Sequence, residues 1–119
     1  MAGLRDPFVG RVLALIHARP THPWTLHELA REVGLSRSAL ADRFTRRIGV
    51  SPMRYLSRRR LLMAADRLGR GLQSVAQIAH EAGYEAEAAF NRAFKREFGV
   101  PPGAFRKAGG GSGEPPGRA

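Results

Sequence analysis

Apolar residues recur every three or four positions along most of this chain, which is the spacing of an α-helix with one buried face. Glycines and prolines interrupt the pattern at intervals, and a Ser or Thr stands before several of the restarts, as is usual at helix N-termini. We therefore expect an all-α fold of about seven helices, over residues 7–19, 26–33, 37–48, 52–69, 75–82, 87–98 and 102–107.

Two of the expected helices begin with the signature of a capping box. In this motif a Ser or Thr side chain bonds the backbone N–H three residues later, and a Glu or Gln at that position bonds back. Thr25 and Glu28 form the first such pair, and Ser74 and Gln77 form the second.

The chain repeats itself after about fifty residues, since FTRRIGVSP at 44–52 returns as FKREFGVPP at 94–102. Each copy consists of a capped helix, a turn that follows a Gly, a second amphipathic helix and the sequence Gly-Val-x-Pro. The equivalent positions are Thr25 and Ser74, Ala30 and Ala79, Gly34 and Gly83, Leu40 and Phe90, Phe44 and Phe94, and Gly49 and Gly99.

A helix, a short turn with Gly and a second helix make the helix-turn-helix motif, whose second helix enters the major groove of DNA. A plain helical hairpin of a repeat protein is the alternative, but such proteins usually need three repeats. The net charge is +10, from 20 basic and 10 acidic residues. This excess of positive charge favours a nucleic-acid partner.

The second copy, SVAQIAHEAGYEAEAAFNRAFKREFGVPPGAFRK, resembles the signature region of the AraC/XylS family of bacterial transcription regulators. The matching residues are Ile78, Ala79, Gly83, Tyr84, Phe90, Arg92, Phe94, Lys95, Gly99, Pro102, Phe105 and Arg106. The resemblance extends over about residues 7–107. It implies two helix-turn-helix subdomains joined by a linker helix, with two recognition helices in successive major grooves of double-stranded DNA.

On this basis we expect one DNA-binding domain at 1–107, with subdomains at 7–50 and 71–107 and a linker helix at 51–70. A linker of about 17 residues spans about 25 Å, which suits two recognition helices roughly 34 Å apart, one turn of DNA. Residues 108–119 have almost nothing to bury, and we expect them to be disordered.

The family's pattern assigns the outward residues of the first recognition helix. Base-contact candidates are Ser38, Ala41 and Asp42, and phosphate-contact candidates are Ser36, Arg37 and Arg46. Ala41 offers only a methyl group to a base. Asp42 either accepts a hydrogen bond from cytosine or pairs with Arg46, four residues further on.

The second recognition helix carries more of the side chains that commonly read bases. The base-contact candidates are Glu87, Ala88, Asn91 and Arg92, with Lys95 at a phosphate. Asn pairs with adenine and Arg with guanine, although Arg92 could equally bind a phosphate. Ala86 and Ala88 replace polar residues that are common in the family, so we expect this helix to lack a side-chain N-cap.

The linker helix adds Arg54, Arg58 and Arg59 as phosphate-contact candidates, whereas Arg60 is expected in a structural ion pair. Most exposed charges on a helix only keep it solvated, and that remains the alternative for these arginines.

Nothing in the sequence indicates an enzyme. There are no cysteines, and the four histidines match no common ligand spacing, so we expect no metal site. No nucleophile triad, phosphate-binding loop or catalytic carboxylate pair is evident, and no cofactor is expected.

No apolar run approaches the roughly 20 residues that cross a bilayer, and the first residues do not form a secretory signal. We therefore expect a cytoplasmic bacterial protein, associated with the nucleoid when bound to DNA. The resemblance also implies RNA polymerase as a partner of an activator, and a separate N-terminal effector-binding or dimerisation domain absent from this chain. A non-specific basic protein that coats DNA or RNA and a protein-interaction module are the alternatives.

Overall fold

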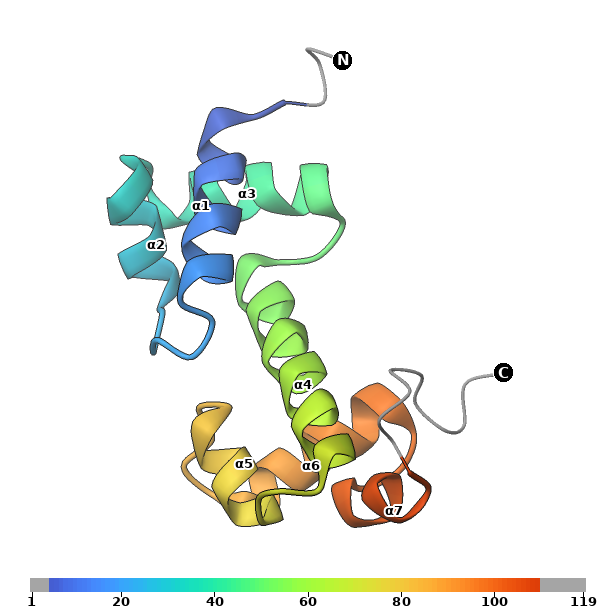
Figure 1. The fold of residues 1–119 in the computed structure, drawn as a ribbon. Helices are drawn as coiled ribbons and strands as arrows, with labels where there is room; N and C mark the ends of the chain where they lie inside the picture. The colour runs from blue at the N-terminus through green and yellow to red at the C-terminus, as the bar shows by residue number, and fades with distance from the viewer. Residues whose placement is uncertain (1–4, 110–119) are drawn as a thin grey trace. The chain divides into compact units, whose positions relative to one another are not determined.

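The computed structural model describes residues 5–109, and all regular secondary structure in this range is α-helical (Figure 1). The helices are α1 (Pro7–Ala18), α2 (Leu26–Val33), α3 (Arg37–Ile48), α4 (Pro52–Arg70), α5 (Val75–Glu81), α6 (Glu87–Phe98) and α7 (Pro102–Lys107). The predicted all-α fold of about seven helices is confirmed, and every helix end lies within one residue of its expected position. Residues 110–119 of the expected disordered tail lie outside the described range.

The helix caps show how local sequence sets these boundaries. Ser74 and Gln77 form the complete capping box that was predicted at the start of α5. The box predicted at α2 is only half formed, and this part of the prediction was wrong. Thr25 Oγ1 accepts from the N–H of Glu28 at 3.0 Å, but the Glu28 carboxylate lies 3.0 Å from His22 Nε2 instead of bonding back. The loop before α2 supplies this competing partner.

The chain divides into two compact units, one ending at Ser57 and the other beginning at Arg58. The first unit contains α1, α2, α3 and the first residues of α4. Its buried core consists of Val9, Val12, Ile16, Trp24, Leu29, Ala30, Leu40, Phe44 and Leu56.

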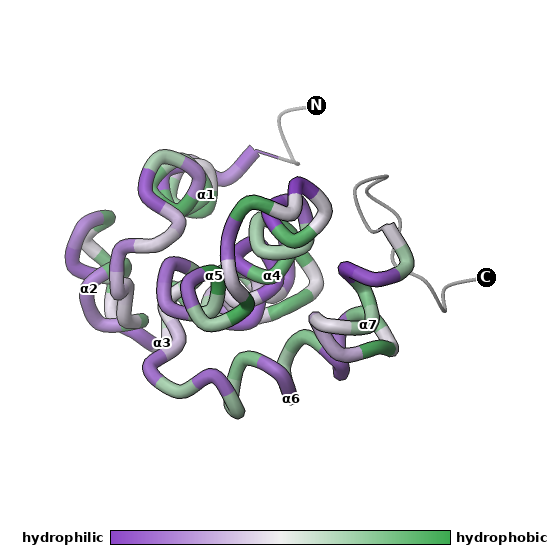
Figure 2. The backbone as a smooth tube through the Cα atoms, turned by 60° about the horizontal axis from the view of Figure 1, so that its bottom comes forward, coloured by the Kyte–Doolittle hydropathy of each residue, from purple (hydrophilic) through white to green (hydrophobic). Residues whose placement is uncertain are grey.

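The second unit contains the rest of α4 together with α5, α6 and α7. Its buried core is rich in aromatic rings and consists of Leu61, Ala64, Ala65, Leu68, Ile78, Ala79, Ala82, Phe90, Phe94, Phe98 and Phe105. The ring of Phe94 lies at the centre, with ring centroids 4.5 Å from Phe98 and 5.3 Å from Phe105. Hydrophobic and hydrophilic residues alternate along the tube of α6 in Figure 2 because only one face of this helix is buried.

The turns of the two motifs begin in the same way, although the second turn is longer, with residues 82–86 between α5 and α6 and residues 34–36 between α2 and α3. Gly34 and Gly83 adopt left-handed conformations, with φ of 76° and 94°. In each turn the residue after the glycine donates its N–H to the carbonyl of the equivalent alanine, Ala30 or Ala79, at 3.0 Å. The internal repeat in the sequence is therefore also a repeat in three dimensions.

The C-terminal end of α4 is held by α7. A helix leaves its last carbonyl groups without partners inside the helix. Arg106 Nε donates to the Leu68 carbonyl at 3.3 Å, and its Nη2 donates to the carbonyl of Gln73 in the loop that follows. This side chain therefore fixes the path from α4 to α5.

Asp6 connects the start of α1 to α3 in the first unit. Its Oδ1 accepts from the N–H groups of Phe8 and Val9, at 2.9 and 3.2 Å, and its Oδ2 lies 3.3 Å from Arg43 Nη1. Burial alone would raise the pKa of Asp6. The two backbone hydrogen bonds and the charges of Arg43 and Arg47 outweigh that effect and hold the pKa below its ordinary value.

We expect Asp6→Ala to destabilise the first unit by about 0.5–2 kcal/mol at neutral pH, the usual effect of losing an N-cap. The pKa of Asp6 is lower in the folded chain than in the unfolded chain. The charged carboxylate therefore stabilises the folded state fully at any pH above the unfolded pKa of about 3.9. This stabilisation is lost as the pH falls through the folded pKa. The loss can be followed in urea unfolding by the fluorescence of Trp24, the one tryptophan of the chain, which is buried in this unit.

The difference in unfolding free energy between the natural chain and Asp6→Ala should therefore shrink below about pH 4. Asp66→Ala is the matched control, because Asp66 lies in the second unit in an exposed pair with Arg70. An equal difference at neutral and acid pH would contradict the assigned role of the Asp6 charge.

Candidate nucleic-acid interface

The expected contact residues of α3 lie on its outer face. Leu40 and Phe44 are fully buried on the inner face, so the opposite side of the helix is left to solvent. Ser36, Arg37, Ser38, Asp42 and Arg46 are exposed, and Ala41 is half-buried. Ser36 Oγ also caps the helix by accepting from the N–H of Ala39 at 3.1 Å.

Asp42 and Arg46 form an ion pair on this face. Both side chains are largely exposed, at 59% and 75%. Exposed pairs four residues apart contribute only about 0.3–0.5 kcal/mol, so DNA could separate them at little cost. In the free protein Arg46 is therefore occupied by Asp42. Arg37, on the same face, makes no ion pair with another described residue.

Thr45 belongs to the same face but was not among the predicted contact residues. It is exposed and follows Ser38 by seven positions and Ala41 by four, so the three lie in one stripe of the helix. The helical spacing was the signal that could have identified it.

The outer face of α6 carries the strongest cationic candidates. Glu87, Ala88, Arg92 and Lys95 are exposed, opposite the buried Phe90, Phe94 and Phe98. Arg92 and Lys95 make no ion pair with any described residue. Their guanidinium and ammonium groups are therefore available to an external anion.

Asn91 is placed differently from its neighbours on α6. The residue is half-buried, and its Oδ1 is buried without a hydrogen-bond partner. A bidentate contact with adenine uses both the carbonyl and the amino group of an asparagine. Asn91 can make that contact only if its side chain rotates outward.

No side chain caps the start of α6. Ala86 occupies the N-cap position in an extended conformation and provides no hydrogen-bond acceptor. The expected absence of a side-chain cap is confirmed here. Backbone N–H groups at the beginning of α6 are consequently left for solvent or a ligand.

The candidate arginines of α4 have three different environments. Arg54 is exposed and has no ion pair with another described residue. Arg58 is held by α6, since its Nε lies 3.1 Å from Glu97 Oε2. Arg59 is half-buried, and its Nε is shielded from solvent without a hydrogen-bond partner.

Arg60 lies against the turn between α5 and α6. A Cβ atom at Gly83 would lie 3.4 Å from its Cζ, so the guanidinium packs against the turn at about van der Waals distance. Burial lowers the pKa of Arg60, and Tyr84 opposes this shift. The Arg60 side chain therefore packs within the second unit and is not part of the outer face of α6.

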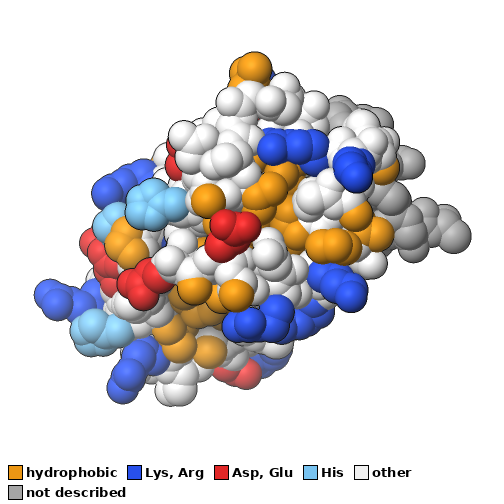
Figure 3. All heavy atoms as spheres, turned by 90° about the horizontal axis from the view of Figure 1, so that it is seen from below, with side chains coloured by type: hydrophobic (Ala, Val, Ile, Leu, Met, Phe, Trp, Pro, Cys, Tyr) orange, Lys and Arg blue, Asp and Glu red, His pale blue; other side chains and the backbone are white. Residues whose placement is uncertain are grey.

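The surface charge is mixed. Figure 3 shows one face of the molecule, on which Lys and Arg side chains alternate with acidic and apolar ones. Several arginines are held by intramolecular ion pairs, namely Arg43 with Asp6, Arg67 with Glu81 and Arg70 with Asp66. Among residues 5–109 no group of three or more His, Asp or Glu residues could hold a metal ion, and no helix combines the length and apolarity needed to cross a membrane.

Comparison with known proteins assigns the family. The model of a helix-turn-helix domain family matches residues 29–108. An AraC-like transcription regulator of Streptomyces lividans is 45% identical over 107 residues, which cover 90% of this chain and 35% of that protein. The chain belongs to the AraC/XylS family. The resemblance inferred from the sequence is confirmed.

A second relative is also a helix-turn-helix regulator. The transcriptional regulator AlkR of Acinetobacter baylyi is 37% identical over 90% of the chain and 35% of its own length. The chain thus spans about a third of the length of the curated relatives that it matches.

Solved structures of domains from two other regulators show the same fold. The C-terminal domain of AraT from Geobacillus stearothermophilus has a TM-score of 0.82 at 27% identity, covering 87% of this chain and 86% of that one. The DNA-binding domain of AdpA, in complex with a target DNA, has a TM-score of 0.80 at 28% identity, covering 87% and 93%.

We expect Ala86→Ser to raise the free energy of unfolding of the second unit by about 0.5–2 kcal/mol, because it supplies the missing N-cap of α6. Urea unfolding followed by circular dichroism would measure the change. Ala88→Ser is the matched control, since the same hydroxyl placed within the helix has no cap to form. Equal effects of the two substitutions would show that the N-terminus of α6 does not need a side-chain acceptor.

Proposed function

We propose that this chain is a sequence-specific double-stranded DNA-binding domain that acts in transcription regulation. The observation that carries the proposal is the division of α3 and α6 into a buried inner face and an outer face with unpaired cations. Arg37 provides such a cation on α3, and Arg92 and Lys95 provide them on α6. Each helix follows a helix-turn-helix turn, which is the position of the DNA-reading helix in this motif.

The comparisons support the same proposal. AdpA, whose DNA-binding domain has a similar fold, is bound to a target DNA in its solved structure. The matched relatives from Streptomyces and Acinetobacter are described as transcription regulators. A common fold and a common family make DNA the partner that best accounts for the outer faces of α3 and α6.

In this proposal α3 reads bases through small side chains. Ser38, Ala41 and Thr45 form the stripe that faces the groove, and Ser36 and Arg37 bind phosphates beside it. Asp42 accepts from cytosine only where Arg46 moves to a phosphate, because the two side chains are paired in the free protein. The first helix therefore discriminates mainly through methyl and hydroxyl contacts.

In the same proposal α6 contributes the stronger contacts. Arg92 reads guanine, Lys95 binds a phosphate, and Glu87 and Ala88 face the groove at the start of the helix. The uncapped N–H groups at the N-terminus of α6 bind a second phosphate, because helix N-termini attract anions. Asn91 reads adenine only after its amide has rotated outward.

The α4 arginines support this interface to different extents. Arg54 binds a phosphate directly, since it is exposed and makes no ion pair with a described residue. Arg58 and Arg59 are weaker phosphate contacts. To bind a phosphate, Arg58 would have to break its ion pair with Glu97. The Nε of Arg59 is buried and cannot reach a phosphate where it lies.

We further propose that the two recognition helices occupy successive major grooves of one DNA face. The domain would act in the bacterial cytoplasm, at the nucleoid, as part of a regulator whose effector-binding or dimerisation domain lies outside this sequence. If the regulator is an activator, RNA polymerase is its partner.

The proposal is tested by selecting bound duplexes from a random DNA library and titrating the selected sequences against scrambled duplexes at several salt concentrations. We expect an asymmetric motif with two elements about one helical turn apart. A single element would mean that one helix only contacts the backbone. Equal affinity for all duplexes, with a steep salt dependence throughout, would identify a non-specific basic protein instead.

We expect Arg92→Ala to weaken the selected duplex by about 1–3 kcal/mol and to relax the preference at one base pair, because a bidentate guanine contact is lost. Fluorescence anisotropy on the selected duplex and on single-base variants would measure both effects. Arg11→Ala is the matched control, because Arg11 is exposed on α1 outside the proposed interface. An equal loss on all duplexes would instead assign Arg92 to a phosphate.

A further inference from the structure

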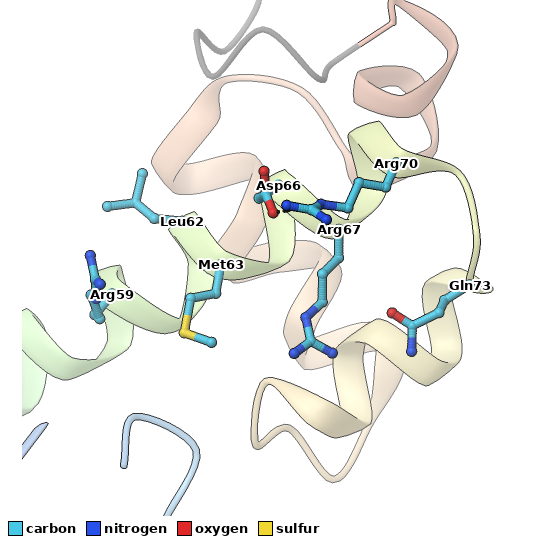
Figure 4. Close-up of a pocket in the computed structure, with 7 residues that line it drawn as sticks. All are labelled: Arg59, Leu62, Met63, Asp66, Arg67, Arg70 and Gln73. Carbon is cyan, nitrogen blue, oxygen red and sulfur yellow. Dashed lines mark hydrogen bonds and ion pairs between the residues drawn. The ribbon is translucent and has the colours of Figure 1, made fainter. Parts of the chain in front are cut away.

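A hollow of about 580 Å³ lies on the second unit along the outer side of α4 and the loop before α5. Its lining residues are Arg59, Leu62, Met63, Asp66, Arg67, Arg70 and Gln73. Figure 4 shows these side chains on α4 and, for Gln73, on the segment after it, with Arg70 turned toward Asp66 and Met63 projecting from α4. None of α3, α5 or α6 contributes a lining residue, and Arg59 is the one lining residue that is also a proposed phosphate contact.

The hollow contains apolar surface that the fold leaves uncovered. Among the described residues, the large apolar side chains that remain exposed are Leu62, at 43%, and Leu72, at 86%. Leu62 lines the hollow itself, and Leu72 directly precedes the lining residue Gln73. Exposed apolar surface with polar residues around it often marks an interaction site, and here Leu62 and the half-buried Met63 supply that surface.

The charges around this apolar surface are mainly positive. Three of the lining residues are arginines and one, Asp66, is a carboxylate, which is paired with Arg70 at 3.0 Å in an exposed pair. Arg67 pairs with Glu81 of α5, and Gln73 Nε2 also donates to this carboxylate, at 2.8 Å. Arg59 makes no ion pair with a described residue, and its buried Nε has no hydrogen-bond partner. A ligand carboxylate would therefore have to reach another part of this guanidinium, because the Nε itself is shielded from solvent.

DNA suits this combination poorly. A phosphate backbone has no apolar side chain to cover Leu62 and Met63, and Asp66 would repel it. A protein segment can place an apolar side chain on these two residues and carboxylates beside Arg59 and Arg70. Such complementary charges around an apolar centre are typical of protein interfaces.

We propose that this hollow is a docking surface for an acidic segment of a protein, in which an apolar side chain lies between carboxylates. The apolar side chain packs on Leu62 and Met63. One carboxylate accepts from Arg59, and another replaces Asp66 as the partner of Arg70. The domain would then bind a protein through α4, while the outer faces of α3 and α6 bind DNA.

The test is a 1H–15N NMR titration of the whole chain without DNA, so that its outcome does not depend on the proposed DNA function. The probe is a peptide of about 12 residues in which pairs of leucine alternate with pairs of glutamate. One control peptide has glycine in place of leucine, and the other has glutamine in place of glutamate. A short DNA duplex serves as the polyanion control.

We expect the leucine–glutamate peptide to shift the amide signals of residues 59–73 and to bind more weakly as salt is raised. Leu62→Ser should weaken it about tenfold, because one apolar contact is lost. Arg70→Ala should weaken it a few-fold, whereas Arg11→Ala should leave it unchanged. Leu62→Ser should not change the affinity for the selected duplex, and Leu62 is exposed enough for this variant to fold.

Two results would overturn the proposal. If the leucine–glutamate peptide shifts no signal in residues 59–73 at millimolar concentration, the hollow is not a docking surface for such segments. If the glycine–glutamate peptide shifts these signals equally, or if the duplex shifts the signals of residues 62–73 equally, the hollow is a general anion site that does not use its apolar surface.

Discussion

Phe90, Phe94 and Phe98 lie one turn apart along α6, and their burial decides which side of this helix faces outward. The rings pack on one another, and those of Phe94 and Phe98 also pack on Phe105 of α7, so rotation of α6 about its axis would expose several aromatic side chains at once. Leu40 and Phe44 fix α3 in the same way. A helix with 3.6 residues per turn that buries one stripe necessarily exposes the opposite one.

The outer faces of α3 and α6 follow from this constraint, but their chemistry differs. On α3 the side chain of Ser36 provides the N-cap, and the opposite charges of Asp42 and Arg46 largely neutralise each other. On α6 no side chain caps the helix, and Arg92 and Lys95 are unpaired among the described residues. The two copies of the repeat therefore share a skeleton while presenting different surfaces, which is what reading two different DNA elements would require.

The positive charge of the chain is also divided between two uses. Some arginines hold the fold together, as Arg43 does with Asp6 at the start of α1 and Arg106 with the carbonyls at the end of α4. Others, such as Arg37 and Arg54, have no partner among the described residues and remain available to an anion. Net charge indicates an anionic partner, but only the position of each side chain shows which cations can reach it.

Much of the fold was determined by the sequence alone, because the signals involved are local. Helix periods, the Ser74–Gln77 capping box and the left-handed glycines depend on residues within about four positions of one another. The repeat and the AraC/XylS resemblance rest on the same local signals, and the missing cap of α6 could be read from Ala86. The outward faces of both recognition helices could be read in this way too.

The contacts between distant residues were decided only by the tertiary structure. Arg106 and Leu68 are 38 positions apart, and Arg58 meets Glu97 only because α4 and α6 pack together. Glu28 bonds His22 of the preceding loop rather than its own helix cap, and the Oδ1 of Asn91 is buried although its position on the helix suggested an outward side chain. Each of these contacts depends on how helices and loops pack against one another, and the spacing of apolar residues along the sequence does not specify that packing.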